Sequence, residues 1–116
     1  MSTDLESVRH QLTVLSKSSR TRIQGWSRGM PSKWHPEQVL DPRSNQCFTE
    51  NGAWEFVTEL LENGHGVEEI VLQDPAGKMG YVMKVAIGAG RPPLYVKLQL
   101  GSGVVIGRSF HYSEHA

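Results

Sequence analysis

The residues best suited to acid–base chemistry lie near the end of the chain, in the stretch LYVKLQLGSGVVIGRSFHY (94–112). Imidazole takes up and releases protons near neutral pH, and lysine and arginine stabilise negative charge on a phosphate. Such a set suits cleavage of RNA without a metal, in which the ribose 2′-OH attacks the adjacent phosphate. The candidate catalytic residues in this stretch are Tyr95, Lys97, Arg108 and His111.

Metal-dependent nuclease chemistry is disfavoured by the sequence, because it needs clustered carboxylates. Most acidic residues lie between positions 50 and 74, away from the C-terminal stretch. The chain also lacks a P-loop, a dinucleotide-binding fingerprint and an HExxH motif. We therefore expect no metal and no other cofactor at the site.

Two runs of alternating apolar residues predict that the candidate residues lie on a β-hairpin, with the three-residue loop GSG at 101–103. This loop length places Leu98 opposite Ile106 and Val96 opposite Arg108, so that one face of the hairpin is apolar. The other face is expected to carry Tyr95, Lys97, Gln99, Gly107, Ser109 and His111.

A bulge near Gly107 is the alternative to this register. It would bring Arg108 onto the polar face and turn Ser109 and His111 away from it. In either register the tyrosine, lysine, arginine and histidine gather near one end of the hairpin, because side chains at a strand end reach around the edge.

Two helices and two further strands are predicted upstream of the hairpin. A capping box and apolar residues at helical spacing predict a helix over residues 4–15. A second amphipathic pattern, preceded by a threonine cap and followed by Asn-Gly, predicts a helix over 49–63. Short apolar runs predict strands over 67–72 and 80–87.

The order of these elements favours an antiparallel meander, because the connections between the strands are short. We therefore expect an α+β fold in which two helices pack on one face of a four-stranded antiparallel sheet (67–112). A chain of 116 residues is close to the commonest domain size, and a single domain over 1–116 is expected.

Residues 16–46 lack periodicity and contain several glycines and prolines, which predicts a long loop. Its basic residues and tryptophans suit contacts with phosphates and unstacked bases. The favoured alternative for the rings is that Trp26 and Trp34 anchor the loop on the core. The candidate RNA-binding residues are Arg20, Arg22, Arg28 and Lys33 in this loop and Lys84 in the sheet.

The formal net charge is zero, yet the charges are segregated along the chain. Residues 17–43 hold six basic and two acidic residues, whereas 50–74 hold seven acidic residues and no lysine or arginine. Five further basic residues follow from position 78, against Glu114 alone. We therefore expect one acidic flank and a basic remainder, toward which a polyanion such as RNA is steered.

The single cysteine, Cys47, excludes an internal disulfide and a cysteine-rich metal site. No apolar run approaches the length of a membrane span, and the start of the chain has no signal-peptide pattern. The sequence therefore predicts a cytoplasmic protein without a membrane partner.

The end of the chain, VVIGRSFHYSEH, resembles the final strand of RelE-type bacterial toxins. The strand pair LYVKLQL and VVIGRSFH is also similar to the C-terminal hairpin of the motility-regulator (MqsR) toxin branch. In this resemblance Tyr95 and Lys97 match the tyrosine and lysine of the sheet. Arg108 matches the phosphate-binding arginine, and His111 and Tyr112 match the terminal histidine and tyrosine. The resemblance thus adds Tyr112 to the candidate catalytic residues.

This resemblance implies a RelE-like fold with helices packed on a curved antiparallel sheet. It implies that the protein is the toxin of a toxin–antitoxin system. Such toxins are mRNA interferases, which are metal-independent endoribonucleases and are grouped with the hydrolases. They act on RNA, in many cases on the ribosome. An antitoxin protein would hold the enzyme inactive.

Two other kinds of protein are alternatives to this enzyme. A non-catalytic module on the same scaffold would bind RNA or a protein through the basic residues, with Arg108, Ser109 and His111 serving only to complete a strand end. An antitoxin-like partner acting through the acidic helix ranks below both, since the chain has no disordered complementary segment.

Overall fold

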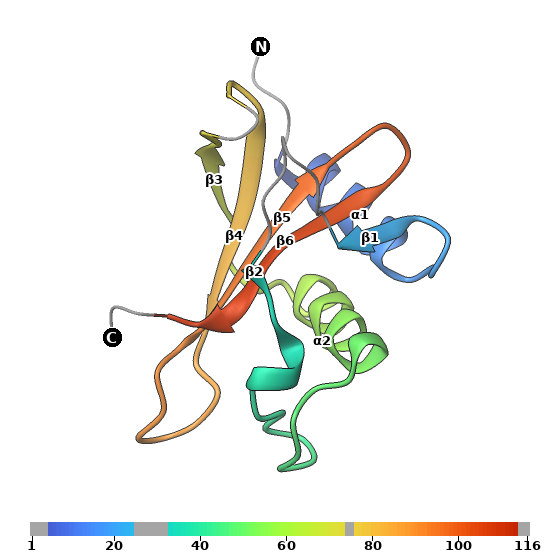
Figure 1. Cartoon of the computed structure of the whole chain (residues 1–116). Helices are drawn as coiled ribbons and strands as arrows, with labels where there is room; N and C mark the ends of the chain where they lie inside the picture. Colours follow the sequence, from blue (N-terminus) through green and yellow to red (C-terminus); the bar gives the residue numbers. More distant parts are fainter. Residues whose placement is uncertain (1–4, 25–32, 74–75, 114–116) are drawn as a thin grey trace.

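Two helices cover one face of a six-stranded sheet, as Figure 1 shows for the computed structural model, which describes residues 5–24, 33–73 and 76–113. The strand order is β1-β6-β5-β4-β3, and β2 also pairs with β6. The elements are α1 (Leu5–Ser16), β1 (Arg22–Gln24), β2 (Lys33–Trp34), the short 3₁₀ helix η1 (Pro36–Gln38), α2 (Glu50–Glu62), β3 (Glu68–Val71), β4 (Met79–Val85), β5 (Leu94–Leu100) and β6 (Val105–Tyr112).

The α+β class and both predicted helices are confirmed. Strands β3 to β6 form the predicted antiparallel meander. Thr49 is the N-cap of α2, and its hydroxyl accepts a hydrogen bond from the Gly52 amide at 2.9 Å. This bond satisfies one of the amides that a helix start leaves without an intrahelical partner.

The predicted number of four strands is wrong, because the segment 16–46 is not only a loop. It contributes β1 and β2, which both run parallel to β6 along the same edge. These strands have three and two residues, too few to show an alternating pattern in the sequence. Their pairing satisfies backbone groups on a β6 edge that would otherwise be open.

The register of the β5–β6 hairpin combines features of both predicted alternatives. Leu98 lies opposite Gly107, not Ile106, and Lys97 lies opposite Ser109. The register shift between these two pairs leaves Arg108 as an extra residue, which is a β-bulge in β6. Four residues, not three, separate the innermost pair, Leu100 and Val105, so the predicted loop length was wrong.

Aromatic rings join the helices to the sheet. Trp34 of β2 stacks on Trp54 of α2 with ring centroids 4.8 Å apart, and it lies 5.2 Å from Phe110 of β6. Trp34 is only 8% exposed, which confirms its predicted role as an anchor. Gly107 makes room for this ring, because a Cβ there would lie 2.6 Å from Trp34 Cε3. Trp26 and Arg28 lie outside the described residues.

No helix within the described ranges is long and apolar enough to cross a membrane.

Candidate functional site

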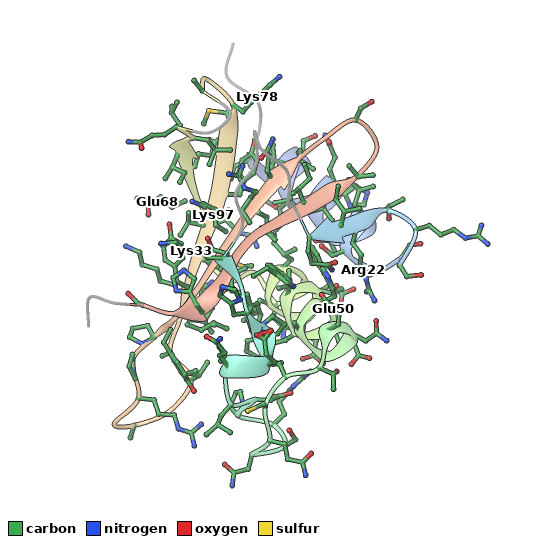
Figure 2. All side chains as sticks on the ribbon, viewed as in Figure 1. Arg22, Lys33, Glu50, Glu68, Lys78 and Lys97 are labelled. Carbon is green, nitrogen blue, oxygen red and sulfur yellow. The ribbon has the colours of Figure 1, made fainter. Side chains whose placement is uncertain are left out.

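The face of the sheet opposite the helices, here called the open face, carries three charged residues in one row with Val82 and Ser109, both of which are buried. Paired positions run across the sheet in register, from Glu68 on β3 through Val82 and Lys97 to Ser109 and Lys33. Figure 2 shows Glu68, Lys97 and Lys33 on the same side of the sheet. Because the side chains of paired residues point to the same face, this row brings together residues 12 to 76 positions apart in sequence.

Arg108 belongs to the open face because of the bulge. Its Nη1 donates a hydrogen bond to Gln99 Oε1 at 2.6 Å, and the residue is only 4% exposed. A guanidinium held by a buried amide is fixed in position, so it loses little rotational freedom when it binds an anion. Arg108 thus lies where the bulge alternative placed it, whereas Ser109 and His111 lie where the register without a bulge placed them.

Lys97 is part-buried beside two other cations. Burial lowers the pKa of its ammonium group, and the positive charges of Arg108 and Lys33 lower this pKa further. Among the described residues Lys97 and Lys33 form no ion pair with a carboxylate. The lowered pKa shows that the positive charges of Arg108 and Lys33 act against the charged form of Lys97, and a bound anion would favour that charged form.

Tyr95 and His111 form a stacked pair on the next row of the open face. They are direct cross-strand partners, and their ring centroids lie 5.5 Å apart. Burial raises the pKa of the Tyr95 phenol, and the negative charge of Glu68 raises it further, so the hydroxyl remains a proton donor. The rows of Lys97 and Tyr95 are about 7 Å apart, since two residues of a strand span this length.

The hydrogen bond made by the His111 ring determines which of its two nitrogens can accept a proton. Its Nδ1 lies 2.8 Å from the carbonyl oxygen of Tyr112. A carbonyl oxygen only accepts, so Nδ1 carries the hydrogen and donates it. In the neutral ring Nε2 then bears the lone pair and can accept a proton.

Tyr112 does not join the other candidate catalytic residues. It pairs with Leu94 on the helix-covered face and packs against the core. Its hydroxyl accepts a hydrogen bond from the Leu40 amide at 3.0 Å. The position next to His111 in sequence was misleading, because successive residues of a strand point to opposite faces.

The candidate RNA-binding residues are divided between the two sides of the sheet. Lys33 lies in the open-face row, and Lys84 pairs with Tyr95 on the same face. Arg22 lies on the helix side, where it donates to Ser16 O at 3.0 Å and Asn51 Oδ1 at 2.8 Å. Figure 2 shows Arg22 beside α2, far from Lys33 and Lys97. Arg20 is exposed in the turn before β1.

The acidic helix and the basic segment before it partly neutralise each other. Arg43 contacts Asp41 and Glu59, and Lys17 contacts Glu62 at 2.8 Å. A pocket of about 320 Å³ beside the end of α1 is lined by Lys17, Arg43 and Glu59, among others. The predicted contrast between an acidic flank and a basic remainder therefore does not hold around α2, where opposite charges of distant blocks meet.

Glu68 and Gln99 are site residues that were not among the sequence-derived candidates. Glu68 reaches the open face through the pairing of β3 with β4, and the register of this pairing was not predicted from the sequence. Gln99 was predicted on the polar face, but its bond to Arg108 depends on the bulge. Within the described ranges no three histidine, cysteine, aspartate or glutamate side chains are grouped so as to hold a metal ion.

No family model, curated protein or solved structure matches the chain.

Proposed function

We propose that the protein is a metal-independent endoribonuclease whose site is the open face around Lys97, Arg108 and His111. The observation that carries this proposal is the meeting of two part-buried or buried cations with a histidine whose Nε2 is available. A phosphate bound beside the cations lies within reach of the imidazole, because adjacent rows of the sheet are about 7 Å apart.

His111 acts as the general base in this scheme. Its Nε2 removes the proton from the ribose 2′-OH, and the 2′ oxygen attacks the adjacent phosphorus. The Nδ1 bond to the Tyr112 carbonyl keeps the ring in the tautomer that this step needs.

Lys97 and Arg108 stabilise the charge that develops on the phosphorane. Arg108 is held in place by Gln99, so it is oriented before the substrate binds. The lowered pKa of Lys97 also makes its ammonium group a better acid for the leaving 5′ oxygen. Bond cleavage then yields a 2′,3′-cyclic phosphate and a free 5′-OH.

Tyr95 supports a neighbouring base. Its ring already stacks on His111, and a base placed on its other side would extend the stack. Lys33 and Lys84 lie on the same face and hold the flanking phosphates.

The resemblance of the C-terminal strand to RelE-type toxins supports a more specific role. In it the protein is the RelE-like toxin of a bacterial toxin–antitoxin system, acts in the cytoplasm on mRNA at the ribosome, and is inhibited by an antitoxin. A neighbouring reading frame for a small antitoxin-like protein would favour this role.

The test is incubation of the purified protein with mRNA in EDTA, alone and with translating ribosomes, followed by mapping of the cut ends. We expect 2′,3′-cyclic phosphate ends and a loss of about 100- to 10,000-fold in rate for His111→Ala. Tyr112→Phe is the matched control, since its hydroxyl lies on the other face. Absence of cleavage in both settings, or cleavage abolished by EDTA, would contradict the proposal.

A non-catalytic RNA-binding module is the second candidate, and one observation favours it. Arg108 is 4% exposed, so a phosphate can approach only part of its guanidinium. In that case His111→Ala would leave RNA affinity nearly unchanged and no cut ends would appear with the unmodified protein.

A further inference from the structure

Strand β3 forms one edge of the sheet. It pairs with β4 on one side, and none of the described residues pairs with it on the other side. Figure 1 shows β3 beside β4 at the side of the sheet away from β1 and both helices. An edge strand leaves a row of amide and carbonyl groups that another extended segment can use.

Each face of β3 presents one carboxylate and one apolar side chain. Glu68 and Ile70 point to the open face, where they pair with Val82 and Gly80. Glu69 and Val71 point to the helix side, where they pair with Tyr81 and Met79.

The apolar side chains at this edge are poorly covered. Val71 is 67% exposed and its partner Met79 is 38% exposed, which makes them two of the most exposed large apolar residues that the structure describes. Glu68 and Glu69 are also exposed, and neither forms an ion pair with any described residue. The edge therefore offers uncovered apolar surface together with two carboxylates that lack a cationic partner.

The two carboxylates of β3 determine which kind of segment can bind at this edge. A second copy of β3 would bring four carboxylates onto two adjacent four-residue strands, and like charges in neighbouring strands repel each other. A segment with basic side chains would place cations against both carboxylates. Antiparallel pairing is the more stable arrangement per residue, and it continues the pattern of β3 to β6.

We propose that β3 binds an extended, basic segment of a partner protein as an added antiparallel strand. The order of residues in β3 fixes the order in the partner. Its first two residues lie opposite Val71 and Ile70 and are apolar, and its next two lie opposite Glu69 and Glu68 and are basic. The recognised pattern is thus two apolar residues followed by two lysines or arginines.

The added strand lies beside the catalytic row and leaves it uncovered. Two strand spacings, about 10 Å, separate β3 from β5 and its Lys97, and the partner would lie one spacing further out. Binding at the edge uses Glu68, which lies in the same row as Lys97, but none of the proposed catalytic residues, so either activity can be present without the other.

The test uses a ten-residue peptide with Val-Ile-Lys-Lys at its centre, titrated into the ¹⁵N-labelled full chain. We expect amide shifts centred on β3. Methylation of the backbone nitrogens of one alternate set of peptide residues should abolish binding, and methylation of the other set should have little effect. Only binding as an added strand predicts a difference between the two methylated peptides. In an added strand, alternate backbone amides point toward β3 and away from it.

Charge reversal provides the second arm. Glu68→Lys/Glu69→Lys should weaken binding roughly tenfold, which corresponds to about 1.4 kcal/mol. A peptide with Val-Ile-Glu-Glu should restore binding to that variant. Glu55→Lys/Glu62→Lys changes the net charge equally on α2 and should have no effect.

Three results would overturn the proposal. They are no binding at millimolar peptide, shifts centred on α2 or on the open face in place of β3, and equal tolerance of both methylated peptides. RNA cleavage is measured separately, so a failure here leaves the proposed function unaffected.

Discussion

The cations on the two sides of the sheet are held in different ways. On the helix side Arg43 makes a two-pronged contact with Asp41, reaches Glu59, and lies 5.3 Å over the Phe56 ring. On the open face Lys97 lies near Lys33 and Arg108, and both lower its pKa. Arg43 contributes to stability through its carboxylate partners, whereas Lys97 is disfavoured in its charged form by burial and by the charges of Arg108 and Lys33.

Under the proposed function, this difference separates cations that stabilise the fold from cations that bind RNA. Composition and sequence order do not separate them, because Arg22 and Lys33 belong to the same basic segment. The fold sends Arg22 to the helix side and Lys33 to the open face through strands of only a few residues. The predictions that follow test this division.

The largest expected effect is on catalysis. Lys97→Met should lower the cleavage rate about 100-fold, because it removes one group that stabilises the phosphorane. The same change should not lower the free energy of unfolding, since it removes a charge that Arg108 and Lys33 repel. Lys17→Met is the control, because this exposed lysine lies on the helix side, where it pairs with Glu62. Cleavage rates and urea unfolding curves would measure both effects. Equal loss of activity in the two variants would contradict the assignment.

On the helix side the expected effect is on stability. Arg43→Ala should lower the free energy of unfolding by about 2 kcal/mol, because it leaves the buried Asp41 carboxylate without its charged donor. Its cleavage rate and RNA affinity, measured where the variant is folded, should equal those of the unmodified protein. A large loss of RNA affinity at unchanged stability would show that the two sides are not divided as described.

The contribution of the Asp41–Arg43 contact to stability should also depend on pH. Burial works to raise the pKa of Asp41, but the hydrogen bonds and charge of Arg43 outweigh it and lower this pKa below 3.8. A carboxyl group with a lowered pKa adds stability above its ordinary pKa, and this stability is lost as the pH falls through the lowered value. The difference in unfolding free energy between the unmodified protein and Arg43→Ala should therefore shrink as the pH falls below 3.8. A difference that stays constant down to pH ~2 would contradict the account.

A smaller effect is expected for Tyr112→Phe. The change removes the acceptor for the Leu40 amide and should cost about 1 kcal/mol of stability. Cleavage should be unaffected, because the hydroxyl lies on the helix-covered face. Thermal unfolding measures the effect on stability, and the cleavage assay measures the effect on activity. A loss of activity without a loss of stability would indicate that Tyr112 takes part in catalysis.

The fold was predictable where a pattern extends over several residues. Helices α1 and α2 and strands β4 to β6 were found because each repeats its apolar spacing several times. Strands β1 and β2 were missed because they are too short to show alternation. Their existence depends on β6, whose edge lies far away in sequence.

The site was predictable in part for the same reason. Alternation placed Tyr95, Lys97 and His111 on one face, and the structure keeps them there. The bulge at Arg108 follows from tertiary pairing and from the packing of Trp34 against Gly107, so it could be named as an alternative but not chosen. Glu68 joins the row only through strand pairing.

The most direct test of the division is the salt dependence of binding to a non-cleavable, 2′-O-methylated single-stranded RNA. Each phosphate contact contributes about 0.7 to the slope of log affinity against log salt. Lys33→Ala/Lys97→Ala should therefore reduce the slope by about 1.4. Lys17→Ala/Arg22→Ala, which removes two cations from the helix side, should leave it unchanged. A reduced slope for the helix-side pair, with no change for the open-face pair, would contradict the assignment of RNA to the open face.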